Sequence, residues 1–344
     1  MTIAANLRRL RSPALGMLLV VITGACHKTD MHQHQESRPL MGTVVDIITE
    51  GPDPALLVSA TDAAYAEMTR LSDMMNHYNP DSVVSAINRD AGVHPVAIPR
   101  ELMQVLTRTR MMSERTDGAF DITVGSLKGW RFSTVHPQMP DAAAITAMLP
   151  LVNYRNVILD EIANTAYLRK KGMRIDLGGI AKLYILDAGM NVLKGHRVIH
   201  AMINGGGDVE VIGTIRGRSW RIGIRDPLHP ERLYAAVDMQ RGFVVSSGDY
   251  ERYFDRDGRR YHHILDPKTG YPTIGPRAVT LISEDLDMVN GLSSSIMVMG
   301  MTRGRALIER NPSMEGIIFG RDASAWVSPV LERRLIFAAK TASP

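Results

Sequence analysis

The stretch SSGDYERYFDRDGRRYHHILDPKTGYP, residues 246–272, gathers most of the chemically useful residue types of the chain into one short segment. Its first residues, 246–248, predict a small turn whose bare glycine backbone can approach a ligand closely. The Asp-Gly pair at 257–258 is a typical turn dipeptide, so the alternating arms at 253–254 and 261–265 predict a β-hairpin. This hairpin is the starting point for a candidate site.

The second arm of the hairpin carries a candidate general base. His262 and His263 lie close in sequence to Asp266, and two prolines and a glycine then fix the direction of the chain. A histidine beside a carboxylate, held by a rigid turn, is suited to accept a proton. An ordinary hairpin with a solvated rim accounts for the same residues, so the segment alone leaves both interpretations open.

The composition is that of a soluble globular protein with a substantial core: 344 residues, 45% hydrophobic and 22% charged. The formal net charge is +4, but Arg8, Arg9 and Arg11 have no acid near them within residues 1–25. Without these three charges the remainder of the chain carries +1. Nucleic-acid binding needs a clustered basic face, so no nucleic-acid partner is expected.

The N-terminus predicts an exported protein. Residues 1–25 resemble a signal peptide, because a basic segment precedes an apolar one at 13–25 that is too short to span a bilayer. Small residues then precede Cys26, the single cysteine, as in a bacterial lipoprotein signal; a plain signal peptide is the alternative. We expect a lipid anchor on Cys26, a membrane-anchored protein facing the periplasm, a polar tether over 26–39 and a folded domain over 40–344.

Hydrophobic periodicity predicts a mixed α+β chain, with β-sheets flanked by helices in one large domain or two intimate subdomains. The order of elements is not a regular βαβ alternation. Helices are expected at 55–76, 81–88, 100–115, 141–148, 180–193, 286–300 and 303–309. Strands are expected at 44–49, 157–159, 166–169, 174–177, 198–203, 209–212, 219–224, 233–239, 242–246, 278–282, 316–319, 325–327 and 334–337.

Three glycine-rich turns each lie next to an acid, at 176–182 (DLGGIAK), 204–208 (NGGGD) and 246–249 (SSGD). A strand-to-helix turn offers free backbone N–H groups and the positive end of a helix dipole to a phosphate, and Lys182 could add a charge there. Walker A, HExxH, paired CxxC and GxGxxG signatures are missing from the sequence. The three turns and the histidine-bearing hairpin together predict a site for a large phosphate-bearing ligand.

Eight motifs in order resemble those of the ApbE family, the FAD:protein FMN transferases, over nearly the whole length from residue 40. They are PLMGT at 39–43, Tyr78 with SxxSxIN at 82–88, DGAFDITVG at 117–125, IDLGGIAK at 175–182, INGGGD at 203–208, SSGDYERYF at 246–254, HHILDPKTGYP at 262–272, and a Met-Gly pair at 299–300. Single motifs are generic, whereas eight in one order are specific. The resemblance implies an ApbE-like fold.

The resemblance also implies an activity: an exported enzyme takes FAD with Mg²⁺, transfers FMN to a threonine or serine hydroxyl of a partner protein, and releases AMP. The flavin site would then be lined by Met41, Tyr78, Ala119, Phe120, Asp121, Asp176, Lys182 and Ile264. Gly179, through its carbonyl, would hold the metal together with Asn290 and Ser294. His263 would take the hydroxyl proton, and Asp266 would orient it or hold the turn.

One departure from the family pattern concerns the metal. The family carries an aspartate followed four residues later by a threonine, where this chain has Asn290 and Ser294. Asn290 keeps a carbonyl oxygen but loses the negative charge, so Mg²⁺ should bind more weakly; Asp287, one helical turn earlier, is the candidate to compensate. Gly291 is also a poor residue for the middle of a helix, and Leu183 stands where the family usually has glycine.

Three functions stay open at this point. The chain is expected to be an active flavin transferase, an FAD pyrophosphatase that uses water as acceptor, or a flavin-binding lipoprotein whose weakened metal site leaves FAD unreacted. Bacterial relatives serve electron-transfer complexes in the membrane, so by analogy the acceptor is expected to be a membrane electron-transfer subunit.

Overall fold

The computed structural model describes residues 30–337. The expected signal peptide at 1–25 and the expected lipid site at Cys26 lie outside the described residues. From Met31 onward the described residues form one compact unit. In this part of the chain, no helix has the length and apolar character needed to cross a membrane.

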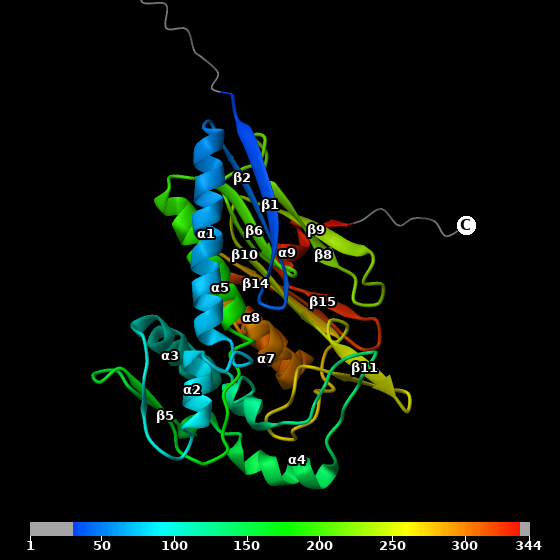
Figure 1. The fold of residues 1–344 in the computed structure, drawn as a ribbon. Coiled ribbons are helices and arrows are strands. Elements are labelled where there is room, and N and C mark those ends of the chain that lie inside the picture. The colour runs from blue at the N-terminus through cyan, green and yellow to red at the C-terminus, as the bar shows by residue number, and fades with distance from the viewer. Residues whose placement is uncertain (1–29, 338–344) are drawn as a thin grey trace, which may run out of the picture. The chain divides into compact units, whose positions relative to one another are not determined.

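The unit is organised around one eight-stranded sheet in which every neighbouring pair is antiparallel (Figure 1). In spatial order its strands are β1 (His32–Leu40), β2 (Thr43–Gly51), β6 (His200–Gly205), β7 (Asp208–Ile212), β10 (Arg241–Gly248), β13 (Ala278–Ser283), β14 (Met314–Phe319) and β15 (Ala325–Val327). Together with the helices, this sheet confirms the predicted α+β class.

Both faces of the sheet are covered in its middle. Every residue of β13 is buried. Successive side chains of a strand point to opposite faces, so Val279 and Leu281 enter one hydrophobic cluster while Ala278 and Ile282 enter the other. A strand with a continuous apolar run is suited to such a two-sided position.

Helices cover the first face of the sheet. They are α1 (Pro54–Met75), α5 (Ala181–Gly195), α7 (Leu292–Met299) and α8 (Met301–Glu309). Asp53 caps α1, because its side chain accepts hydrogen bonds from the amides of the first turn. Gly189 lets α5 approach α1 closely, since a Cβ at that position would lie 2.8 Å from the Met68 side chain.

A smaller antiparallel sheet covers the second face. Its strands are β8 (Trp220–Arg225), β9 (Leu233–Met239) and β16 (Ile336–Phe337), and the short helix α9 (Pro329–Glu332) lies beside them. In β8 buried and exposed residues alternate strictly. That alternation is expected of a strand that packs on one face only.

The remaining elements carry the turns of the candidate site. They are α2 (Val83–Arg89), β3 (Val96–Ala97), α3 (Arg100–Arg115), the 3₁₀ turns Ile122–Ser126, Leu149–Leu151 and Tyr154–Asn156, α4 (Ala142–Met148), β4 (Val157–Asp160), β5 (Thr165–Leu168), the hairpin strands β11 (Tyr253–Arg256) and β12 (Arg259–His262), and α6 (Leu286–Val289). Ser82 caps α2, because its side chain accepts a hydrogen bond from the Ser85 amide.

The prediction of a polar tether as far as residue 39 is wrong. Residues from His32 form β1, which pairs with β2 from the His32–Gly51 position to the Leu40–Thr43 position. Polar side chains are compatible with this placement, because β1 is an edge strand with one row of side chains half buried and the other exposed. Folded structure therefore begins before residue 40.

Three further local predictions were wrong. Residues 174–177 belong to no strand. The expected turn at 246–248 is the end of β10, where Ser246 pairs with Thr280 of β13. The single helix expected over 286–300 is two helices, α6 and α7, separated at Asn290 and Gly291.

The hydroxyl of Tyr65 joins the first helix to the edge of the sheet, and this contact is testable. The buried Oη lies 2.8 Å from both the Glu36 and Val45 carbonyl oxygens, which it can donate to. Tyr65→Phe removes the donor from two carbonyls, so it should lower the free energy of unfolding by about 1–2 kcal/mol in urea titrations. Tyr167→Phe is the control, because within residues 30–337 its hydroxyl makes no hydrogen bond; equal losses in both variants would contradict the assignment.

Candidate active site

The β11–β12 hairpin has two chemically different faces. Tyr253 pairs with His262 and Phe254 pairs with Tyr261, and paired residues share a face. On the His262 side the contacts are polar. On the other side Phe254 and Tyr261 stack at 5.3 Å between ring centroids, and Trp130 stacks on Tyr261 at 6.2 Å.

His262 has a structural role. Its side chain is fully buried, and Nε2 lies 2.9 Å from the Thr273 carbonyl oxygen, to which it can donate. Nδ1 accepts a long bond of 3.4 Å from the Ile264 amide. Burial lowers the pKa of His262, with the Thr273 hydrogen bond opposing it, so the imidazole is neutral and committed to the turn.

His263 follows the end of β12 and is differently placed. Its amide donates to the Arg252 carbonyl at 3.1 Å, whereas its Nδ1 is buried and has no hydrogen-bond partner among residues 30–337. Burial, the charge of Arg252 and His262 together lower the pKa of His263 to about 3. The imidazole is therefore neutral at neutral pH and its Nδ1 is uncommitted, although a pKa this low disfavours its protonation in the ligand-free protein.

Asp266 holds the turn that follows His263. Its Oδ1 accepts from the Lys268 amide at 2.8 Å, and its carbonyl accepts from the Gly270 amide at 2.8 Å. In the described part of the chain it makes no hydrogen bond to His263. Of the two roles expected for Asp266, the contacts support the structural one, and the direct catalytic role is not seen.

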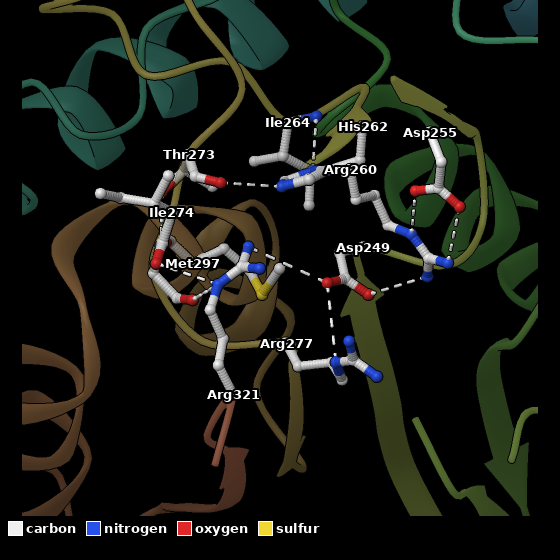
Figure 2. A network of polar contacts seen from close by, with 11 residues as sticks. Asp249, Asp255, Arg260, His262, Ile264, Thr273, Ile274, Arg277, Met297 and Arg321 are labelled. Atoms are coloured by element: carbon white, nitrogen blue, oxygen red, sulfur yellow. Dashed lines mark hydrogen bonds and ion pairs between the residues drawn. The ribbon is translucent and has the colours of Figure 1, made fainter. Parts of the chain in front are cut away.

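A buried carboxylate anchors the polar face of the hairpin (Figure 2). Asp249 is fully buried, and neither of its oxygens has a hydrogen-bond partner among the described residues. Three guanidinium groups surround it, with nitrogen–oxygen distances of 3.7 Å for Arg260, 3.8 Å for Arg277 and 3.9 Å for Arg321. Ion pairing with these arginines compensates the burial of this charge.

The same network reaches α7. Arg321 Nε donates to the Ile274 and Gly275 carbonyl oxygens at 3.1 and 3.0 Å. Thr273, whose carbonyl contacts His262, donates through Oγ1 to the Met297 carbonyl at 2.9 Å. The hairpin that carries His263 is thereby fixed to the sheet and to the helix that carries Ser294.

The turn at Asp176 is built from side chains in place of a strand partner. The Asn88 amide group pairs with the backbone of Ile175, accepting from its N–H at 2.6 Å and donating to its carbonyl at 3.0 Å. Asp176 Oδ1 accepts from the Gly178 amide at 2.8 Å and lies 3.3 Å from His77 Nδ1. This pairing satisfies the backbone of Ile175, although residues 174–177 belong to no sheet.

The carboxylate of Asp176 is kept ionised. Burial works against its ionisation, but the hydrogen bond and charge of His77, the Gly178 amide and the charge of Arg252 together lower its pKa below the ordinary value. Arg252 therefore acts on both Asp176 and His263. The Asp176 turn and the hairpin consequently lie within electrostatic reach of one guanidinium.

Phe120 brings the expected metal-binding segments together. A Cβ at Gly179 would lie 3.3 Å from the Phe120 ring, and one at Gly291 would lie 2.8 Å from it. Gly291 also has φ +78°, which disfavours other residues. Asn290 precedes this glycine and Ser294 follows it by three residues. The contact with Phe120 therefore requires a glycine at the break between α6 and α7.

The donors at this point are neutral. Within the described residues, no three His, Cys, Asp or Glu side chains gather as a metal-binding cluster. The buried Asn290 amide has an Nδ2 without a partner among residues 30–337, and Ser294 Oγ donates to the Gly291 carbonyl at 3.0 Å. The expected compensation by Asp287 is not seen, because its carboxylate pairs with Arg108 at 2.9 Å.

Lys182, the second residue of α5, is bound to the second glycine turn. Its Nζ lies 2.6 Å from Asp208 Oδ2, and Asp208 Oδ1 accepts from the Ser246 amide at 3.2 Å. Ser247 Oγ lies 2.9 Å from Ser293 Oγ of α7. The three glycine-rich turns are therefore connected through side chains, although the charge of Lys182 is already paired.

The other expected flavin-site residues have mixed environments. Met41 forms the β1–β2 turn beside a groove of about 720 Å³, and Tyr78 is 79% exposed next to His77, with 3.9 Å between ring centroids. Ala119 is half buried. Ile264 is buried in the main core. Exposed Tyr78 and the Met41 groove are open to a ligand, whereas the Ile264 side chain is not.

Asp121 is committed to the protein. One carboxylate oxygen accepts from Thr123 and the other accepts from the Tyr154 amide at 2.8 Å. Burial raises the pKa of Asp121, and these hydrogen bonds oppose the rise. Its side chain caps the 3₁₀ turn Ile122–Ser126, so any contact with FAD would come from its backbone.

Three residues at the site were not singled out from the sequence. Asn88 and Asp208 are parts of sequence motifs; for Asn88, a polar residue on the buried side of a short helix is a usable signal. His77 carried no such signal, because its partner Asp176 lies about one hundred residues away in the sequence. These long-range contacts become visible only in the fold.

The depressed pKa of His263 predicts an acid-sensitive stability. Between the ordinary value near 6.5 and about 3, the unfolded chain binds a proton that the folded protein does not, so stability is lost as the pH falls below about 6.5. Lowering the pH from about 7.5 to about 5 should reduce the free energy of unfolding of the wild type by about 1–2 kcal/mol more than that of His263→Gln. Urea unfolding of both proteins at both pH values measures this difference. Equal losses of unfolding free energy in the wild type and in His263→Gln would contradict the burial of the imidazole.

Known proteins are similar to this chain in sequence and in fold. The sequence pattern of the ApbE family matches residues 41–318. The FAD:protein FMN transferase of Klebsiella pneumoniae is 34% identical over 292 residues, covering 84% of this chain and 90% of the relative; that of Treponema pallidum is 29% identical over 329 residues, covering 90% and 91%. The crystal structure of the ApbE protein from Thermotoga maritima superposes with a TM-score of 0.80 at 32% identity, covering 88% of this chain and 99% of that one. The flavin transferase ApbE from Vibrio cholerae gives 0.76 at 25% identity, covering 89% and 100%. The chain therefore belongs to the ApbE family.

Proposed function

We propose that this chain is an FAD:protein FMN transferase that moves FMN from FAD to a threonine or serine hydroxyl of a partner protein and releases AMP. Its curated relatives carry that transferase name. The observation that supports the proposal most directly is the uncommitted, neutral imidazole of His263, whose hairpin is fixed to the helix that carries Ser294 and shares the influence of Arg252 with Asp176.

The residues suggest how the transfer proceeds. His263 accepts the proton of the acceptor hydroxyl as its oxygen attacks the phosphorus of the FMN half of FAD. The new oxygen–phosphorus bond forms while the bond from that phosphorus to the bridging oxygen breaks, and the electron pair leaves with AMP. The proton on the imidazole then passes to the departing phosphate or to solvent. Asp266 keeps the turn, and therefore the imidazole, in place.

The residues near Phe120 fit a weakly bound Mg²⁺. The Gly179 carbonyl, the Asn290 amide oxygen and Ser294 Oγ are oxygen donors, which this ion prefers, and the buried Asn290 amide group has no committed N–H partner in the described chain. These three residues would hold the ion. When bound, it would neutralise charge on the phosphates of FAD. A neutral donor set implies low affinity.

Incubating the protein with FAD, Mg²⁺ and a candidate acceptor tests the proposed function. A transferase gives a fluorescent acceptor band together with AMP, whereas AMP without the band indicates FAD hydrolysis. If neither product forms but flavin fluorescence changes, the protein only binds FAD. Our proposal would be wrong in either of the last two cases.

His263→Ala should abolish AMP release while FAD still binds, because the substitution removes the proton acceptor and leaves the other site residues in place. Product formation and flavin fluorescence are measured on the same samples. His94→Ala, at an exposed histidine before β3, is the matched control. Turnover that survives His263→Ala would remove this residue from the mechanism.

Asn290→Asp should lower the Mg²⁺ concentration needed for half-maximal AMP release by about tenfold, because the carboxylate adds a negative charge to a neutral oxygen set. A titration of Mg²⁺ at saturating FAD measures the shift. Ser324→Asp, on an exposed turn before β15, controls for the change in net charge. An unchanged midpoint would mean that Asn290 does not face the metal.

The setting of the reaction is part of the proposal. A signal at 1–25 with lipid on Cys26 would deliver the enzyme to the periplasmic side of a bacterial membrane. An acceptor in a membrane electron-transfer complex would meet it there. Globomycin-sensitive processing and loss of membrane association in Cys26→Ala would test this location.

A further inference from the structure

We infer that Arg252 binds the pyrophosphate of FAD, as a bidentate cation beside His263. No motif expectation for this chain assigned a role to Arg252. The inference rests on the proposed use of FAD, and it names the residue that supplies positive charge to the linked phosphates.

The position of Arg252 follows from the hairpin register. Tyr253 pairs with His262 at the end of the ladder. One step further, the His263 amide donates to the Arg252 carbonyl at 3.1 Å, so these two residues are direct cross-strand neighbours. Directly opposed residues of an antiparallel pair place their side chains on the same face, with Cβ atoms about 4.5–5.5 Å apart. The Arg252 side chain therefore lies on the same face of the hairpin as the candidate base, His263.

The guanidinium of Arg252 is uncommitted. Its residue is exposed, and within residues 30–337 its side chain makes no ion pair and no hydrogen bond. The arginines around it differ: Arg260 pairs with Asp255 at 3.1 Å and lies by Asp249, and Arg225 pairs with Glu251 at 3.3 Å. In a chain with this many paired arginines, an unpaired one beside the proposed base is available for an anionic ligand.

The positive charge of Arg252 acts on ionisable groups of both parts of the site, the glycine turn and the hairpin. It contributes to lowering the pKa of Asp176 on the glycine turn and that of His263 on the hairpin, after larger causes in each case. A ligand that bridges the turn and the hairpin would therefore meet this guanidinium. Arginine presents paired N–H donors that match phosphate oxygens, which a lysine does not reproduce.

The other sources of positive charge are weak in this chain. Lys182 Nζ is paired with Asp208 at 2.6 Å, so its charge is largely neutralised. The metal position has Asn290 where a carboxylate would bind Mg²⁺ more tightly, and Asp287 is engaged by Arg108. A pyrophosphate diester carries two negative charges, and Arg252 is an exposed cation next to His263 that is unpaired within residues 30–337.

Affinity for FAD compared with riboflavin tests this role, because riboflavin shares the flavin ring and lacks both phosphates. By flavin fluorescence titration, Arg252→Gln should weaken FAD binding about tenfold or more, the effect expected for a lost charge-assisted hydrogen-bond pair. Its affinity for riboflavin should stay at the wild-type value. Arg252→Lys keeps the charge but loses the paired N–H donors, so its FAD affinity should lie between those of the wild type and Arg252→Gln.

Arg256→Gln is the matched control, since Arg256 lies four residues after Arg252 in the same hairpin arm, at the hairpin tip, where it meets Asp257 at 3.6 Å. It should bind both flavins as the wild type does. If Arg252→Gln binds FAD as tightly as the wild type does, the role of Arg252 is wrong, while the proposed function still stands. The same conclusion follows if Arg252→Gln loses riboflavin binding and FAD binding to the same extent. A wild type that binds no FAD would overturn the proposed function as well.

Discussion

The buried carboxylate of Asp249 is the constraint on which the candidate site depends. A charge with no exposed surface is stable in a protein only when opposite charges surround it. Its three arginine partners come from β12, from the residue before β13 and from the residues after β14. Because each must stay near the same carboxylate, the hairpin, the sheet and the turn after Thr273 cannot shift independently.

The large sheet provides the frame, and the turns beyond its strands provide the chemistry. β7 and β10 are neighbours, so Asp208 at the start of one binds the Ser246 amide near the end of the other. Helix α5 adds Lys182 to that carboxylate, and α7 adds Ser293 to Ser247. The polar contacts thus join segments that are remote in sequence, while the hydrophobic clusters on both faces keep the strands in register.

Local signals in the sequence were enough for most of the architecture. The apolar period of α1, the Asp-Gly turn of the hairpin and the β-branched run of β2 predicted those elements nearly at their observed ends. The polar strand β1 could not be predicted, because its partner β2 and the hydroxyl of Tyr65 determine its conformation. The break at Gly291 was missed for a similar reason, since the Phe120 ring that packs against this glycine comes from a distant segment.

The candidate site, like the fold, has a part that the sequence could predict and a part that it could not. Motif order located His263, the Asp176 turn and the Asn290 position, whereas the roles of their neighbours depended on long-range pairing. Asp287 illustrates the limit: its spacing from Asn290 suggested help for a metal, but Arg108 of α3 binds it instead. Asp121 and Asp266 were expected at the ligand and are committed to turns, because a carboxylate can satisfy backbone amides as readily as it can contact a substrate.

The early start of β1 has a geometric consequence for a lipid-anchored enzyme. Six peptide steps separate Cys26 from His32, and an extended chain covers at most about 3.3–3.6 Å per residue, which amounts to roughly 20 Å. An anchored domain would therefore be confined to the layer of solvent next to the headgroups. If the domain is an anchored flavin transferase, it would meet its acceptors at that membrane, and proteins diffusing freely through the compartment would have to come to it.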